Sequence, residues 1–169
     1  HIAIQAMAQW EGKDRPYLAL AGGSIYGDDS SGYEQELRTL ITSCGLEEDV
    51  ALLGGVADVA SVYASADLIV QPAIYPEGFG RVVVEAQLAG IPVIATDIGG
   101  ARELIDHGES GLLVPVGDST ALRTAIERVL TDQHLKHMLI SSGQESGRRF
   151  SANRHVDAIE TIYQDVLSR

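Results

Sequence analysis

One stretch decides the fold: residues 67–96, which read DLIVQPAIYPEGFGRVVVEAQLAGIPVIAT. The apolar run 67–72 predicts a strand that Pro72 ends. The loop 73–80 follows, and then a helix from about Arg81 to Ala89, which Gly90 ends. A second apolar run, 92–96, predicts the next strand. Strand, helix and strand in this order are typical of a parallel sheet, in which helical crossovers join neighbouring strands.

The same alternation covers the rest of the chain. The other expected elements are strands at 17–21, 50–53 and 111–114, and helices at 2–10, about 37–44, 56–66, 101–106, 118–131, 133–147 and 152–168. Asp118 and Ser119 are suitable N-caps for the helix at 118–131. We therefore predict an α/β fold, a Rossmann-like three-layer α/β/α domain over residues 1–169 with a parallel sheet and closing helices at about 133–169.

Composition excludes several classes of protein. The formal net charge is −12 and the isoelectric point about 4.6, and no basic cluster exceeds Arg148-Arg149, so we expect no nucleic-acid partner. No apolar run approaches the roughly 18 residues of a membrane span, and the N-terminus lacks a signal-peptide pattern. The single cysteine, Cys44, rules out an internal disulfide and favours a cytoplasmic location.

The loop before residue 81 has the features of an anion site. Gly78 and Gly80 permit positive φ and let a ligand approach the backbone. The N–H groups of Gly80, Arg81 and Val82 are expected to point out of the helix N-terminus, where the helix dipole favours a negative charge. A phosphate is the ligand that this pattern predicts.

Two acidic residues lie on either side of this predicted anion site. Glu77 precedes it in the loop and Glu85 follows it in the helix, so the two carboxylates can flank a bound diphosphate and accept hydrogen bonds from sugar hydroxyls. An alternative stays open from the spacing alone: Glu77 as an acid favoured near a helix N-terminus, and Glu85 as a solvated surface residue.

The pattern of motifs resembles a known family. It comprises Tyr63-x-x-Ala66-Asp67, Glu77-Gly78-Phe79-Gly80 through Glu85-Ala86, Ala89-Gly90-Ile91-Pro92-Val93, Gly99-Gly100 with Glu103, Gly111-Leu112-Leu113-Val114, and Gly117-Asp118. These segments, in this order, resemble the C-terminal, donor-binding domain of retaining, two-Rossmann-domain (GT-B type) group 1 glycosyltransferases with a Glu-x7-Glu motif.

The resemblance implies a role for each candidate residue. Glu77 contacts the donor sugar as the residue assigned to catalysis, and Glu85 contacts the ribose hydroxyls. The residues implied to hold the diphosphate or sugar through the backbone are Gly78, Phe79, Gly80, Arg81 and Val82, and those implied to lie against the base are Gly54, Gly55 and Val56. For Gly99 and Gly100, a tight turn and a ligand contact are both open.

The resemblance also implies an activity. The chain is expected to bind a nucleoside-diphosphate sugar for transfer to an acceptor with retention of anomeric configuration, without a metal or other cofactor. It begins at His1, and we expect the N-terminal acceptor domain, the first strand and a loop with an Arg and a Lys to lie outside it. The isolated chain is then expected to be inactive, and the full-length enzyme to associate peripherally with a membrane.

Other residue patterns give little support for a metal site or for nucleophilic catalysis. His134 and His137 are three apart on a helix, but no third metal ligand is evident. His107 has no Ser or Cys partner, which argues against nucleophilic catalysis. Two alternative functions stay open, namely a non-catalytic nucleotide-sugar-binding module and a sugar-nucleotide epimerase. The base, the sugar and the acceptor are not predicted.

Overall fold

The computed structural model describes residues 1–12, 14–23 and 30–168. Its elements in chain order are α1 (Ile2–Ala8), β1 (Leu18–Ala21), α2 (Ser30–Ser43), β2 (Val50–Gly54), α3 (Val59–Ser65), β3 (Ile69–Gln71), α4 (Arg81–Ala89), β4 (Val93–Thr96), α5 (Ala101–Leu104), β5 (Leu112–Val114), α6 (Ser119–Thr131), α7 (Gln133–Arg148) and α8 (Ala152–Leu167). The predicted alternation of strands and helices is confirmed, and the fold is α/β and Rossmann-like.

The described strands form two parallel sheets. In one sheet β1 pairs with β2, with Leu18 opposite Val50. In the other sheet β4 lies between β3 and β5, with Ile94 opposite both Val70 and Leu112. The prediction of parallel strands is confirmed, but the strands do not make one continuous sheet, because no ladder joins β1 to β3 within the described ranges.

The strand β4 shows why the domain has three layers. Its four residues are all buried, as expected for a central parallel strand that is covered on both faces. Ile94 belongs to an apolar cluster with residues of α1, α6 and α7. Val93 and Ala95, which point to the opposite face, belong to a second cluster with residues of α4 and α5. Helices therefore cover both faces of this sheet.

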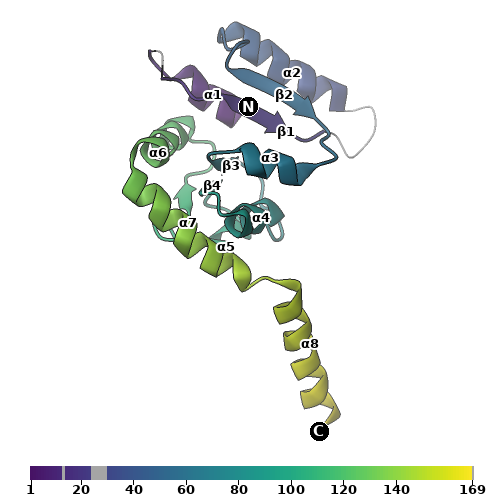
Figure 1. Cartoon of the computed structure of the whole chain (residues 1–169). Helices are drawn as coiled ribbons and strands as arrows, with labels where there is room; N and C mark the ends of the chain where they lie inside the picture. The colour runs from purple at the N-terminus through teal and green to yellow at the C-terminus, as the bar shows by residue number, and fades with distance from the viewer. Residues whose placement is uncertain (13, 24–29, 169) are drawn as a thin grey trace.

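A third apolar cluster lies at the other sheet. Ile4 and Met7 of α1 pack there against Ile41, Leu46 and Val50. Since α1 contributes to this cluster and to the α6 side of β4, it joins the two sheets. Figure 1 shows α1, α2, β1 and β2 grouped at one end of the molecule, and α8 extending away from the body at the other.

Helix boundaries follow their capping residues. Asp118 accepts a hydrogen bond from the Ala121 N–H at 2.8 Å, which confirms it as the N-cap of α6. The expected start of α3 at residue 56 is wrong by three residues. Its N-cap is Asp58, whose carboxylate accepts from the Ser61 N–H at 3.2 Å, and an N-cap residue itself lies outside the helix.

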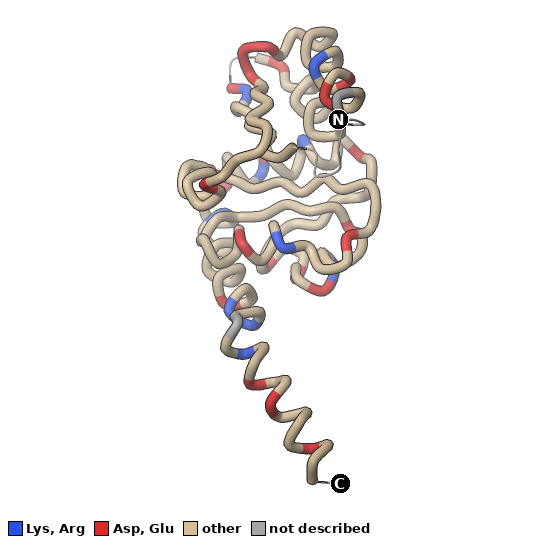
Figure 2. The backbone as a smooth tube through the Cα atoms, turned by 90° about the vertical axis from the view of Figure 1, so that its right-hand side faces the viewer, with Lys and Arg blue, Asp and Glu red and all other residues tan. Residues whose placement is uncertain are grey.

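Charged residues lie on helices and loops, and the five described strands carry none. Figure 2 shows the acidic segments, with basic segments as short, separate stretches among them. In the described ranges, no helix is both long enough and apolar enough to cross a membrane.

Candidate functional site

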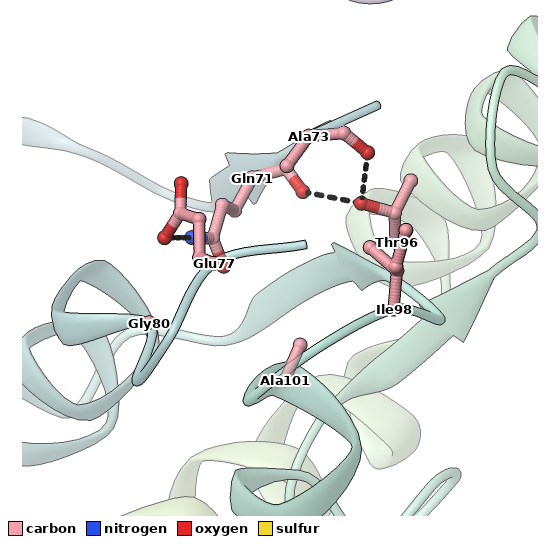
Figure 3. A pocket seen from close by; sticks show the side chains of 7 residues that line it. All are labelled: Gln71, Ala73, Glu77, Gly80, Thr96, Ile98 and Ala101. Carbon is pink, nitrogen blue, oxygen red and sulfur yellow. Dashed lines mark hydrogen bonds between the residues drawn. The ribbon is translucent and has the colours of Figure 1, made fainter. Parts of the chain in front are cut away.

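A small pocket lies where β3 and β4 end. Three of its lining residues, Gln71, Ala73 and Thr96, stand at or just beyond these carboxyl ends, and Glu77 and Gly80 come from the loop before α4. Figure 3 shows these side chains around the pocket, with Ala101 at the start of α5 beneath them. Ligands of open parallel sheets bind at this edge.

The Glu77 carboxylate is held by an amide from inside the fold. Gln71, the last residue of β3, is 8% exposed. Its side-chain N–H donates to Glu77 Oε2 at 2.5 Å, as the dashed line in Figure 3 marks. A neutral donor leaves the negative charge of Glu77 in place and fixes where one of its oxygens lies.

Thr96 fixes the backbone around this amide. Its hydroxyl lies 2.7 Å from the Ala73 carbonyl oxygen and 3.3 Å from that of Gln71, and donates to these acceptors. A side chain of β4 thereby holds the end of β3 and the first residues of the loop. Residues of the sheet, Gln71 and Thr96, therefore support the side of the pocket where Glu77 lies.

The glycines that open α5 support the same loop from below. The Gly100 N–H donates to the Glu77 carbonyl oxygen at 3.0 Å. A Cβ atom on Gly100 would lie 2.4 Å from the Phe79 carbonyl oxygen, and one on Gly99 would lie 2.6 Å from that of Glu77. Only glycine permits this close approach. Gly99 and Gly100 have a packing role, which favours the tight-turn alternative over a ligand contact.

The loop turns into α4 at Gly80. Gly80 is the N-cap and has φ +84°, a left-handed conformation that favours glycine. The first helical hydrogen bond runs from the Val83 N–H to the Gly80 carbonyl oxygen at 3.0 Å. The N–H groups before Val83 have no acceptor within the helix, as at any helix N-terminus. The predicted anion-binding end of α4 therefore opens beside the pocket.

The side chain of Phe79 packs against a second aromatic ring. It lies edge-on to the ring of Phe150, a residue between α7 and α8, with centroids 5.6 Å apart. Phe79 is 48% exposed, and its contact with a donor stays a prediction.

Glu85 lies one turn further along α4 and has two partners. The Tyr63 hydroxyl of α3 donates to Glu85 Oε2 at 2.9 Å, and the Arg81 guanidinium donates to Oε1 at 3.0 Å. The Arg81 side chain is 83% exposed, whereas that of Glu85 is 37% exposed. Burial, then the hydrogen bond to Glu85 and its negative charge, raises the pKa of Tyr63. The Tyr63 hydroxyl therefore stays a donor, and the alternative of a fully solvated Glu85 does not describe this carboxylate.

The remaining predicted residues lie around these two acids. Gly78 is exposed in the pocket loop and Val82 is 37% exposed in the first turn of α4. Gly54 ends β2, and Gly55 and Val56 follow it before α3. Gly54 therefore lies in the other sheet, and Gly55 and Val56 lie in the loop between it and α3, which carries Tyr63. Their assignment to a base stays a prediction.

Sequence reasoning missed the two residues that hold the acids. In the sequence, Gln71 is an ordinary strand residue and Tyr63 is the first residue of the Tyr63-x-x-Ala66-Asp67 motif, and neither pattern indicates a side-chain partner elsewhere in the chain. A polar residue closing an apolar strand immediately before a loop with an acid is the signal that was available for Gln71.

His107, which the sequence left without a catalytic partner, serves local structure. His107 Nδ1 accepts a hydrogen bond from the Leu113 N–H at 2.9 Å. In the residues that the structure covers, no group of three or more His, Cys, Asp or Glu side chains is placed to hold a metal ion.

Comparison with known proteins gives consistent matches. The family described as "Glycosyl transferases group 1" matches residues 1–146. An exopolysaccharide phosphotransferase of Streptomyces coelicolor is 37% identical over 99% of this chain and 17% of its own length. A phosphatidyl-myo-inositol mannosyltransferase of Mycobacterium leprae is 38% identical over 81% of this chain and 37% of its own.

The solved structures agree with these matches. The crystal structure of Anabaena HepE in complex with UDP-glucose has a TM-score of 0.87 and 36% identity, over 97% of this chain and 44% of that chain. This chain therefore spans less than half the length of each of these three proteins.

Proposed function

This chain belongs to the group 1 glycosyl transferase family, and we propose that it supplies the donor-binding half of an enzyme that transfers a sugar from a nucleoside-diphosphate sugar to an acceptor, with retention of anomeric configuration. One observation carries the proposal. Glu77 stands in a pocket at the opening of α4, and Glu85 stands one turn inside the same helix. The complex of HepE with UDP-glucose supports a nucleotide sugar as the donor.

The donor is proposed to lie along this loop and helix. Glu77 accepts hydrogen bonds from the sugar hydroxyls and positions the sugar for transfer. The backbone N–H groups from Gly78 to Val82 bind the diphosphate, which the dipole of the nine-residue helix α4 favours. Glu85 accepts hydrogen bonds from the ribose hydroxyls.

The base is proposed to lie near the end of β2. Gly54, Gly55 and Val56 follow this strand, and the chain then enters α3, whose Tyr63 reaches Glu85. A base attached to a ribose at Glu85 is proposed to extend along α3 toward these residues.

The proposed chemistry is electrostatic. A departing nucleoside diphosphate gains negative charge, and N–H groups fixed at a helix N-terminus stabilise that charge without first having to reorient. Glu77, held by the Gln71 amide, keeps the sugar in place relative to the bond that breaks. No metal or other cofactor takes part in this proposal.

The separation of the two sheets supports a further strand between them in the parent protein. In the doubly wound strand order 3-2-1-4-5-6, the first strand lies between the second and the fourth. The pairs β2-β1 and β3-β4-β5 correspond to strands 3-2 and 4-5-6 of this order. We propose that a preceding strand, with an Arg and Lys loop and an acceptor domain, completes the site. The isolated chain then binds donor weakly and transfers nothing.

The proposed setting of the parent enzyme is the cytoplasm. The lone cysteine of this chain, Cys44, agrees with a reducing compartment. Peripheral association of the full-length enzyme with a membrane is also proposed, since one relative is a mannosyltransferase of phosphatidyl-myo-inositol, a membrane lipid.

Product analysis separates this function from its rivals. The parent protein is incubated with an acceptor and a donor labelled in the sugar and, separately, in the β-phosphate. A glycosyltransferase moves only the sugar label to the acceptor. A phosphotransferase, the activity in the name of the Streptomyces relative, moves both labels. An epimerase changes the sugar on the donor, and a binding module changes nothing.

Nucleotide binding tests the site itself. UDP, GDP and ADP are titrated into the chain and into Glu85→Ala, with Glu48→Ala, an exposed acid before β2, as the control. We expect at least one nucleotide to bind, Glu85→Ala to weaken it about tenfold through a lost charged hydrogen bond, and the control to bind as the wild type. Equal binding by all three proteins would contradict the assignment.

A further inference from the structure

The hydrogen bond between Tyr63 and Glu85 joins a second helix to the proposed ribose site. Tyr63 lies on α3, seven residues long, whose N-terminus is capped by Asp58. Its ring packs against the apolar cluster that contains Val83 and Val84 of α4. Ring and hydroxyl are therefore placed by packing, and the hydroxyl meets Glu85 Oε2 at 2.9 Å.

The second partner of Glu85 holds it less firmly. Arg81 lies on the same helix, four residues earlier, and its side chain is largely exposed. Exposed ion pairs of this spacing contribute little, because solvent screens them and two long side chains lose freedom in forming them. A partly buried hydroxyl on a different helix restrains the carboxylate more.

The hydrogen-bonding capacity of Glu85 leaves room for a ligand. An ionised carboxylate offers about four lone-pair sites, two on each oxygen. Tyr63 occupies one site on Oε2 and Arg81 one on Oε1. One site on each oxygen remains, which matches two neighbouring hydroxyl donors.

We propose that Tyr63 is a positioning residue that holds the Glu85 carboxylate so that its two oxygens face the vicinal hydroxyls of the ribose. This inference rests on the proposed function, since it takes Glu85 as the ribose ligand. The Tyr63 hydroxyl does not touch the ligand in this arrangement; it acts through Glu85.

The test compares ribose with dideoxyribose nucleotides. UDP, GDP and ADP, each beside its 2′,3′-dideoxy analogue, are titrated by NMR into the wild type, Tyr63→Phe, Glu85→Gln and the double variant. Tyr17→Phe, an exposed tyrosine ahead of β1, is the matched control. Tyr63→Phe keeps the ring and its packing, and thermal unfolding checks that the fold is unchanged.

The proposal expects a loss that is confined to the ribose form. Tyr63→Phe should weaken the bound ribonucleotide about three- to tenfold, leave the dideoxy analogue unchanged, and weaken nothing further once Glu85→Gln is present. Tyr17→Phe should bind as the wild type does.

Different results overturn different statements. If Glu85→Gln loses ribose affinity and Tyr63→Phe does not, the positioning role is wrong while the proposed function stands. Equal losses for the ribose and dideoxy forms would make Tyr63 merely structural, and the inference would again be wrong. If Glu85→Gln binds every nucleotide as the wild type does, the ribose assignment fails, and the role of Tyr63 fails with it.

Discussion

The two acids of the site are held in different ways. Glu77 stands at the end of the sheet, where a buried amide from β3 holds it and the backbone of Gly100 supports its loop. Glu85 stands on the outer side of α4, where a tyrosine from α3 and an exposed arginine hold it. Buried groups therefore hold the Glu77 end of the site, whereas more exposed side chains hold the Glu85 end.

This difference indicates how each end responds to change. Buried contacts between backbone segments cannot adjust to added atoms, because the surrounding structure is closely packed. Exposed ion pairs adjust freely and contribute little. We expect substitutions in the buried contacts that support Glu77 to have larger effects than substitutions in the exposed ion pair of Glu85.

The largest effect is expected from Gly100→Ala. The new methyl group would lie 2.4 Å from the Phe79 carbonyl oxygen, so the loop that carries Glu77 must move. The free energy of unfolding, measured in urea, should fall by about 1–3 kcal/mol. The matched control is Gly78→Ala in the same loop, where no atom lies within 4 Å of the added carbon. It should change stability by less than about 0.5 kcal/mol, and equal effects of both variants would refute the rigid support.

A smaller effect is expected from Gln71→Leu. This substitution removes the amide that donates to Glu77 and puts an apolar side chain of similar size in its place. Affinity for the nucleotide sugar should fall about tenfold, the value of a hydrogen bond to a charged group, while affinity for the nucleoside diphosphate alone stays within about threefold. Calorimetry with UDP and UDP-glucose measures both. Equal losses for the two ligands would mean that Gln71 does not act through the sugar.

A still smaller effect is expected from Arg81→Ala. Because the arginine is 83% exposed, stability should change by less than about 0.5 kcal/mol, and nucleotide affinity by less than about threefold. A loss of tenfold or more that disappears at high salt would instead make Arg81 a direct ligand of the diphosphate. The Glu85 end of the site would then depend on Arg81 as strongly as the Glu77 end depends on Gln71.

The smallest effect concerns pH. Burial, the hydrogen bond to Glu85 and its charge raise the pKa of Tyr63. An unfolded tyrosine ionises near pH 10, so above that pH the unfolded chain loses a proton that the folded chain keeps. The free energy of unfolding is therefore unaffected by this group at lower pH, and falls as the pH rises past about 10. Over this range, chemical denaturation should show Tyr63→Phe losing less stability than the wild type. Parallel curves would contradict a retained proton.

The fold could be predicted from the sequence because its signals are local. Apolar runs, Gly90 after α4 and Asp118 before α6 act within a few residues, and most elements lie where those signals are. The helix expected at about 37–44 is an exception, because α2 already begins at Ser30. The start of α3 shows the limit, since the side chain of Asp58 sets it and the apolar Val56 only suggests it. The two-sheet pairing depends on contacts between distant strands, which no local pattern encodes.

The site could be predicted only in part for the same reason. The acids and glycines of residues 77–85 are adjacent in sequence, so their spacing was informative. Gln71 and Tyr63 act across the fold, by pairing with Glu77 and Glu85 from another strand and another helix. Their chemistry becomes visible only once β3, α3 and α4 are placed.

The most direct test of the central claim is a crossed comparison of the two acids. Glu77→Ala and Glu85→Ala are each titrated with the best-binding nucleoside diphosphate and with its glucose conjugate. Glu85→Ala should weaken both ligands by the same factor, because both carry the ribose. Glu77→Ala should weaken only the conjugate, by about tenfold. If both variants bind both ligands as the wild type does, or if Glu77→Ala weakens the nucleotide alone as much as its conjugate, the assignment of the two ends is wrong.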